Sequence, residues 1–440
     1  MRKPPLSRTR KWFGLGLLAL LILGLVWHFS PGLPVLFGPW ASASTKQAGL
    51  ELFVHDWQPN DPLANGDGVG PVFNATSCVA CHNQGGIGGG GGMEHNVQTF
   101  TVLPSVRDPE VRNGAIHADA VPNVPKETFD LLRQKYPVIK GGTRVVNHCS
   151  INVADLDPLH IDQVQTTALF GAGWIDRISD KAIVTARRKH LLTGLIQEFK
   201  LDFENIPPGR ARRLPDGRIG KFGWKAQFAT LDEFVAAACA NEIGLGTPMS
   251  KQAAPLSSPG YAAEAPADLT RKQFRAMVAF CETLPRPVES LPANGAERDR
   301  AARGKQLFTG IGCAVCHTPD MGGVKGVYSD FLLHRLDDGT PGNGGPGYGS
   351  VPEVPLPDEF PRLDEWKTPP LWGVADSAPY MHDGMAATLE ASILRHGADA
   401  KAVREAYRKL SPDDQQAVIA FLQTLKAPPD ALPAKSVAQK

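Results

Sequence analysis

The chain has 440 residues and a formal net charge of +1 at pH 7, with 46 Lys and Arg against 45 Asp and Glu. This length allows two or three domains, and a hydrophobic content of 42% is enough for real cores. The nearly neutral charge gives no support for a nucleic-acid-binding protein. Aromatic residues make up only 8%, whereas 45 Gly and 38 Pro indicate that much of the chain forms loops.

Residues 1–44 resemble a signal peptide or a membrane anchor. Several basic residues precede an uncharged apolar run from Trp12 to Trp27. The small-x-small sequence Ala41-Ser42-Ala43 is typical of a cleavage site, but it lies rather far beyond the run. The run itself is shorter than the roughly 20 residues that a bilayer span needs, unless the residues from Phe29 to Phe37 extend it. Cleavage and retention both stay open, and in either case we expect an exported or periplasmic protein.

Two C-x-x-C-H motifs organise the chain, Cys78-Val79-Ala80-Cys81-His82 and Cys313-Ala314-Val315-Cys316-His317. Two thiols at this spacing can add across the vinyl groups of one haem, and the adjacent histidine reaches the iron. A zinc site would need a second ligand pair nearby, and a redox dithiol does not need the histidine. The sequence therefore predicts two covalently bound haem c groups, attached through four cysteines and ligated by two histidines: Cys78, Cys81, Cys313, Cys316, His82 and His317.

The surroundings of the two motifs also repeat. Gly49–Phe53 and Gly304–Phe308 read as opening helices, and residues 269–280 and 410–421 read as closing helices. We therefore expect a mainly α protein with two tandem cytochrome c-type domains and long loops. The expected boundaries are 45–290 for the N-terminal domain with insertions, 297–428 for the C-terminal domain and 429–440 for a disordered tail.

Some segments leave alternatives open. The glycine-rich run at 85–92 predicts either a flexible linker or backbone that passes close over a haem. Residues 101–165 cannot be placed on a fold from their pattern. Outside the haem motifs remain Cys149, Cys239 and Cys281, which allow one disulfide at most, with the pairing open.

A second repeat lies between each motif and its closing helix. Thr230-Leu231-Asp232-Glu233 and Thr388-Leu389-Glu390 each open a helix with a hydroxyl cap and an acid in the first turn. Alignment on the two threonines places His396 opposite Ala238. Histidine therefore stands in the C-terminal repeat where the N-terminal repeat has no ligand.

The haem motifs, the block Gly220–Gln227 and the block from Thr368 to Gly384 together resemble the di-haem oxidoreductase family, which is similar to bacterial di-haem cytochrome c peroxidases. The resemblance runs from about residue 48 to residue 425. It implies an active haem in the first domain and an electron-transfer haem in the second.

The resemblance also implies roles for particular residues. His396 stands where these peroxidases usually have a methionine ligand, so the second iron should be bound by two histidines and have a lower potential. Glu233 is the best match to the catalytic glutamate and Asp232 the next, while Trp224 replaces His382 in the repeat and could pass electrons between the haems. Relatives hold calcium near the carbonyls that correspond to Ser377 and Pro379, although the matching asparagine is missing here.

These observations predict a peroxidase-like oxidoreductase. Peroxide or another small oxidant would react at the first haem, and an electron-donor protein or a quinol-linked reductant would supply the second. A membrane is a further partner if the N-terminal segment is retained. The alternative is an electron-transfer cytochrome without catalysis, which would be favoured if Met93, His95 or another side chain ligates the first iron.

Overall fold

The computed structural model describes residues 32, 34–104, 112–146, 149–153, 155–187, 209–258, 266–336 and 360–434. The basic and apolar part of the predicted signal or anchor lies outside these residues. Among the described residues, no helix is both long enough and apolar enough to cross a membrane.

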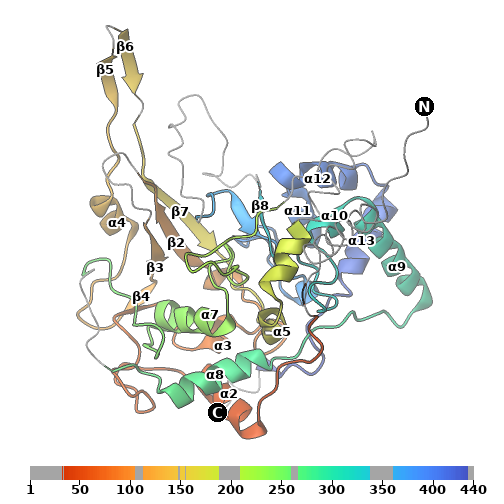
Figure 1. The fold of residues 1–440 in the computed structure, drawn as a ribbon, viewed down its shortest axis with the longest axis horizontal. Coiled ribbons are helices and arrows are strands. Elements are labelled where there is room, and N and C mark those ends of the chain that lie inside the picture. The colour runs from red at the N-terminus through yellow and green to blue at the C-terminus, as the bar shows by residue number, and fades with distance from the viewer. Residues whose placement is uncertain are drawn as a thin grey trace, which may run out of the picture.

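The first opening and closing helices pack against each other. Ser42 caps α2 (Ala43–Val54) by accepting a hydrogen bond from the Thr45 amide, and α8 (Arg271–Glu282) lies across it (Figure 1). The helices approach most closely at Gly49, where any side chain would collide with the Ala276 carbonyl on α8. Close packing at this point is possible because glycine has no Cβ.

The second pair, α9 (Gly295–Gly310) and α13 (Pro412–Leu422), repeats this crossing. Gly304 takes the place of Gly49, since a side chain there would collide with the Ala417 carbonyl. The aromatic contacts match as well: the ring centroids are 5.1 Å apart for Phe53 and Phe280, and 5.2 Å apart for Phe308 and Phe421. The predicted opening and closing helices are therefore present in both halves, while the domain boundaries stay a prediction.

Shorter helices bring the remaining functional segments into place. They are α3 (Cys78–Cys81), α5 (Ala172–Asp176), α7 (Leu231–Ala238) with the π-helical turn Cys239–Ile243, α10 (Cys313–Cys316), α11 (Leu389–Leu394) and α12 (Lys401–Arg408). Single turns of 3-10 helix occur at Met93–His95, Val374–Asp376 and Ala398–Ala400. Both C-x-x-C segments thus form one helical turn that ends at the motif histidine.

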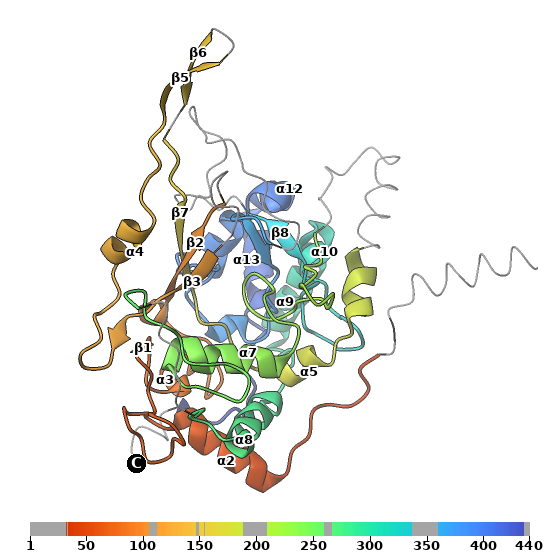
Figure 2. The same cartoon turned by 60° about the vertical axis from the view of Figure 1, so that its left-hand side comes forward.

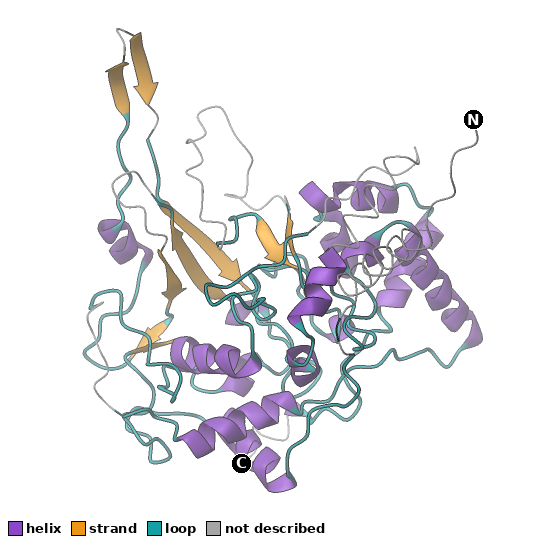
Figure 3. Ribbon diagram, viewed as in Figure 1, coloured by secondary structure: helices purple, strands orange, loops and turns teal. Residues whose placement is uncertain are grey.

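Antiparallel sheets occupy the part of the chain that the sequence pattern did not place. In the three-stranded sheet, β2 (Val97–Val102) lies between β3 (Arg112–Ile116) and β7 (Leu159–Val164). Its buried face packs with Leu132 of α4 (Phe129–Lys135) into a small core of its own. The fold is therefore largely helical with added sheet, and the strands lie mostly on the side away from α9 and α13 (Figure 3).

Three two-stranded sheets complete the fold. One is a hairpin of β5 (Gly142–Val146) and β6 (Cys149–Val153), which projects from the body in both views (Figures 1 and 2). The others pair β1 (Val72–Phe73) with β4 (Asp119–Ala120), and β8 (Leu333–Arg335) with β9 (Glu365–Lys367).

Residues 429–434 pack against the glycine-rich run, although the sequence predicts a disordered tail from residue 429. The Ile87 amide donates a hydrogen bond of 2.7 Å to the Leu432 carbonyl, and a side chain at Gly86 would collide with Ala431. The glycine-rich run is likewise no flexible linker, because Gly86–Gly91 are buried. The tail is ordered here because it covers this glycine loop. Residues 435–440 lie outside the described part of the chain.

Candidate functional site

His317 is held in the state that a metal ligand requires. Burial and the nearby His396 lower the pKa of His317 to about 4, so its imidazole is neutral. Its Nδ1 lies 3.1 Å from the Tyr328 carbonyl, which can only accept a hydrogen bond, so Nδ1 carries the proton. The lone pair therefore lies on Nε2. A backbone carbonyl in this position is the usual support of a ligating histidine.

His396 faces His317 from the other side of the same space. Thr388 caps α11 through the Ala391 amide, and His396 follows that helix with Nδ1 donating to the Ser392 carbonyl at 2.8 Å. The centroids of the His317 and His396 rings are 6.4 Å apart. Two imidazoles on opposite sides of one metal, each with a bond of about 2 Å, would have centroids roughly 6 Å apart. The space between the rings thus fits the predicted iron.

A cavity of about 280 Å³ adjoins these histidines. Its walls include both thiols of the second motif and a largely apolar surround: Cys313, Cys316, Phe308, Phe331, Trp366, Leu371 and Ile393. The cavity continues to Thr166–Phe170 and Phe222–Trp224 of the N-terminal half. An apolar cavity with two thiols and two facing imidazoles matches the donor set of a c-type haem.

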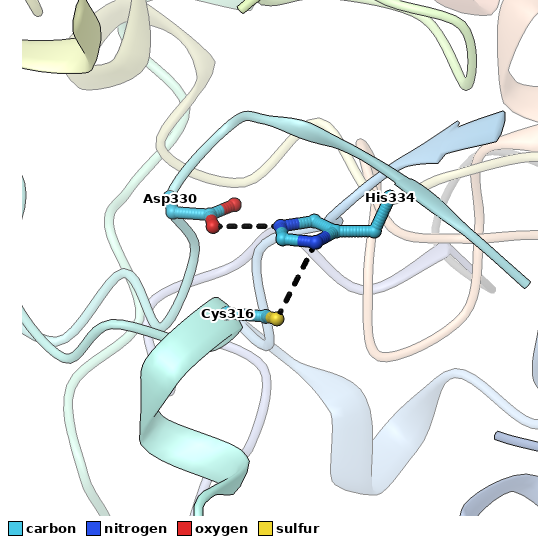
Figure 4. A group of neighbouring side chains, drawn as sticks. All are labelled: Cys316, Asp330 and His334. Atoms are coloured by element: carbon cyan, nitrogen blue, oxygen red, sulfur yellow. Dashed lines mark hydrogen bonds and ion pairs between the residues drawn. The ribbon is translucent and has the colours of Figure 1, made fainter. Parts of the chain in front are cut away.

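Cys316, Asp330 and His334 form a cluster beside this cavity (Figure 4). The Cys316 Sγ lies 3.7 Å from His334 Nδ1, and His334 Nε2 lies 2.9 Å from Asp330 Oδ2. The cluster alone would suit a zinc ion or an activated thiol. Cys316 also belongs to the C-x-x-C-H motif, and a thioether to haem would remove its thiolate from either role. The paired thiols and facing histidines favour the haem.

The N-terminal motif has the same support around its histidine. His82 Nδ1 lies 3.1 Å from the Gly89 carbonyl, and burial lowers the pKa of His82 to about 4. The ring centroids of Phe53 and His82 are 6.2 Å apart, and those of Phe308 and His317 are 6.3 Å apart. The glycine loop therefore supports the histidine through a backbone carbonyl.

The structure does not bring the predicted acids to this histidine. Glu233 Oε2 accepts hydrogen bonds from the Ala229 and Thr230 amides at the start of α7, and its other oxygen pairs with Arg218. Asp232 accepts a hydrogen bond from the Thr230 hydroxyl. Glu233 lines a separate hollow together with Arg218 and Ala237. Both side chains thus have clear structural roles as helix caps, and their catalytic role stays a prediction.

A different acid, Glu242 in the π-helical turn after α7, lies beside the first haem motif. The Asn74 side-chain amide donates to Glu242 Oε2 at 2.7 Å, and the Asn74 and Ala75 backbone amides donate to its carbonyl. Burial raises the pKa of the Cys81 thiol to about 11, with the charges of Glu242 and Glu94 as smaller causes. Alignment on Thr230 and Thr388 places Glu242 opposite Ala400, which lines the C-terminal cavity. That alignment, extended one turn further, could have found it.

Burial sets the protonation of Glu242. Desolvation raises its pKa above the ordinary glutamate value, so its carboxyl group keeps a proton to higher pH. The buried His117 donates a hydrogen bond of 2.7 Å from Nδ1 to Glu127 Oε2, and the neighbouring Ala118 amide donates to Asn74 Oδ1. The Glu242 carboxyl group is therefore partly buried, and the hydrogen bond from Asn74 fixes its position.

Aromatic rings connect the two halves. The Trp224 indole N–H donates to the Gln165 carbonyl at 2.7 Å, and its ring meets His382 edge-on at 6.4 Å. His382 stacks on Trp366 with centroids 3.5 Å apart, and the Lys225 ammonium lies 3.3 Å from the Trp366 centroid. Trp224 and His382, which are equivalent in the repeat, thus contact each other where the halves meet.

The structure also shows where the three remaining cysteines, Met93 and His95 lie. Cys239 and Cys281 are buried in one apolar cluster and Cys149 is exposed on the projecting hairpin, and none forms a disulfide in this structure. The Met93 side chain is 52% exposed. The His95 side chain is partly exposed, and its Nε2 lies 3.8 Å from Glu94 Oε1.

Comparison with known proteins places this geometry in context. The family described as "Di-haem oxidoreductase, putative peroxidase" matches residues 163–425. The methylamine utilization protein MauG of Methylorubrum extorquens is 32% identical over 139 residues, which cover 30% of this chain and 36% of that protein. The matched part is thus only about a third of that relative's length.

Two solved structures are also similar. One is the hydrazine synthase of Kuenenia stuttgartiensis, with 17% identity, a TM-score of 0.33 and coverage of 60% of this chain and 73% of that one. The other is a MauG-like protein associated with microbial copper homeostasis, with 20% identity, a TM-score of 0.29 and coverage of 49% and 72%.

Proposed function

The chain belongs to the di-haem oxidoreductase family, and from this premise we propose that it is a peroxidase-like enzyme with substrate chemistry at the N-terminal haem. The C-terminal haem would relay electrons to it. Cys78 and Cys81 would hold the first haem covalently, and Cys313 and Cys316 the second. When bound, haem supplies an iron that exchanges single electrons and, where a coordination position is open, takes up a small oxidant.

The proposal rests on a difference between the two halves at the position of the second iron ligand. The rings of His396 and His317 face each other with centroids 6.4 Å apart, which supports the proposal that both histidines would hold the C-terminal iron. Ala238 occupies the equivalent position in the N-terminal half and has no donor atom. An iron with two protein ligands suits electron transfer, and one with a free position suits substrate binding.

The residues around the first site have separable tasks. His82, oriented by the Gly89 carbonyl, would hold the iron. Glu242, rather than Glu233, would move the proton that cleavage of a peroxide bond requires, because it is the partly buried acid that Asn74 holds near the motif. Trp224, with His382 and Trp366, would provide the path for electrons between the halves.

The test of this function is cyanide binding to the fully oxidised protein. Because one iron would be open and the other closed, we expect one cyanide per chain and a spectral change at the N-terminal haem alone. In the His82→Gly variant the N-terminal iron loses its protein ligand, so the spectrum of that haem should change before any cyanide is added, whereas the C-terminal haem should keep its spectrum. The measurement is a titration followed by optical and electron paramagnetic resonance spectra.

The same titration separates the enzyme from an electron carrier. His95 is the described residue that would favour the carrier if its imidazole closed the first iron. Spectra of both haems that do not respond to cyanide would establish the carrier and reject the enzyme. Response of both haems would instead reject His396 as a ligand.

We also propose calcium between the two halves. Three buried amide oxygens have no hydrogen-bond partner within the described residues: Gln84 Oε1, Asn96 Oδ1 and Gln165 Oε1. Their amide nitrogens donate to the carbonyls of Ala378, Asp383 and Pro379. Calcium takes amide and backbone carbonyl oxygens among its ligands, and these amides would take the place of the missing asparagine.

The calcium proposal predicts one tightly held ion per chain. Replacing Gln84 with leucine should remove the ion and lower the melting temperature, because an oxygen ligand at the junction is lost. Gln58→Leu is the matched control, since that side chain is exposed and bonded to Asp56. Metal analysis after dialysis measures the ion, and equal calcium in both variants would exclude Gln84.

We propose that the protein acts outside the cytoplasm. Basic residues followed by the apolar run Trp12–Trp27 support export, and haem attachment at C-x-x-C-H motifs belongs to exported proteins. An electron-donor protein or a quinol-linked reductant would then reduce the C-terminal haem, and peroxide or another small oxidant would react at the N-terminal haem.

A further inference from the structure

The described residues that precede α2 are part of the folded body. The Val35 amide donates to the Gly322 carbonyl at 2.8 Å, and the Val35 side chain packs against the main apolar core. Gly38 lies so close to Trp174 of α5 that any side chain would collide with the indole. In Figure 2 this segment, drawn in red to orange, runs along the edge of the molecule to the start of α2.

These contacts bear on whether Ala41-Ser42-Ala43 is cut. Ser42 is the N-cap of α2, and its hydroxyl oxygen accepts a hydrogen bond from the Thr45 amide at 3.2 Å. Cleavage after Ala43 would remove the cap and every contact made by residues 34–40. Loss of such a cap costs about 1 kcal/mol. When residues 34–43 are retained, they are thus part of the folded structure.

The same segment presents apolar side chains to solvent. Leu36, Phe37 and Trp40 are 72%, 80% and 81% exposed, the largest exposed fractions among the large apolar side chains of the described residues. They follow closely on the apolar run Trp12–Trp27. Tryptophan and phenylalanine beside an apolar run are typical of the headgroup region of a bilayer.

Basic side chains flank this apolar surface. Arg286 lies 5.0 Å from the Trp174 ring and donates to the Lys325 carbonyl, and Lys181 lies next to Gly32. Arg286 and Lys181, two basic residues beside this segment, suit a bilayer with anionic headgroups.

We propose that the N-terminal apolar run is an uncleaved anchor and that Leu36, Phe37 and Trp40 lie in the headgroup region of an anionic bilayer. Gly322 and its neighbours hold the segment, and the loop that contains them supplies the Tyr328 carbonyl to His317. The membrane therefore lies next to the C-terminal haem site. An electron donor in or on the membrane reaches that site first. The inference rests on the proposed export but not on the chemistry at either haem.

The experiment uses the full chain, produced with its own N-terminus in a Gram-negative host that matures c-type cytochromes. N-terminal sequencing of the haem-containing protein tests retention. For the surface, the Leu36→Cys and Met385→Cys variants are made in a Cys149→Ser background and placed in nanodiscs with anionic lipid. Met385 is the control because it is 63% exposed elsewhere. Labelling by a membrane-impermeant maleimide is compared with labelling of each variant in denaturant.

We expect a sequence that begins before residue 34, and labelling at position 36 slowed about tenfold in nanodiscs relative to position 385. A mature protein that begins at Ser44 would overturn the inference. So would equal labelling rates at the two positions. The inference and the proposed peroxidase function fail separately, because cyanide binding tests neither the N-terminus nor the position of the bilayer.

Discussion

The His396→Ala variant should keep both haems covalently attached but convert the C-terminal haem from fully low-spin to high-spin. The four cysteines are unchanged, so attachment is unaffected, whereas the iron loses its second imidazole. The ring of His396 faces His317 at 6.4 Å, and its Nδ1 bond to the Ser392 carbonyl aims Nε2 into the space between them. Electron paramagnetic resonance of the oxidised protein measures the change, and cyanide should then bind at two sites per chain.

Met381→Leu is the matched control for this variant. Met381 lines the same cavity, and the Ser392 hydroxyl lies 3.3 Å from its sulfur. A thioether is the ligand type expected from the peroxidases, so Met381 is the natural rival to His396. We expect leucine here to leave the low-spin spectrum unchanged. High-spin iron in Met381→Leu, with a low-spin signal in His396→Ala, would assign the ligand to Met381.

The sequence repeat predicts the helical frame well because the packing at its centre is simple. Gly49 and Gly304 precede the haem motifs at similar spacing, and each allows a backbone carbonyl of the closing helix to approach. Phe53 and Phe308 then meet equivalent phenylalanines. These contacts involve few residues at fixed helical spacing, so they are visible in the sequence.

The strands at 97–164 could not be predicted in the same way. The side chains of Phe100, Val102 and Leu159 become buried only when β7 pairs with β2, and these strands are some sixty residues apart in the sequence. Short strands of this kind carry little periodicity of their own. The order of residues 429–434 depends on a loop more than three hundred positions away, which no local pattern records.

A match to a family motif was not enough to identify the catalytic acid. Glu233 has the right residue type at the start of the right helix, yet its carboxylate accepts hydrogen bonds from the backbone amides that begin that helix. An acid in the first turn serves as a cap in many helices, so its presence alone does not indicate catalysis. Glu242 escaped notice because it lies beyond the helix, in a π-helical turn.

The Glu242→Gln variant should lose peroxide turnover by a factor of about 10² to 10⁴, the range that a general acid or base contributes. The amide keeps the shape of the side chain and its place beside Asn74, but it cannot exchange a proton. Cyanide affinity at the first haem should change little, because binding of cyanide breaks no oxygen–oxygen bond. Steady-state turnover and the cyanide titration give the two measurements.

Glu233→Gln is the control, since glutamine can still accept the capping hydrogen bonds at Ala229 and Thr230. We expect its turnover to stay within about twofold of the wild type. Because burial raises the pKa of Glu242, the wild-type rate should fall as the pH rises and this carboxyl group loses its proton. Glu242→Gln should lack that decline, and Glu233→Gln should keep it. Loss of turnover in Glu233→Gln with normal turnover in Glu242→Gln would assign the catalytic role to Glu233 instead. The start of α7 would then have to face the N-terminal haem.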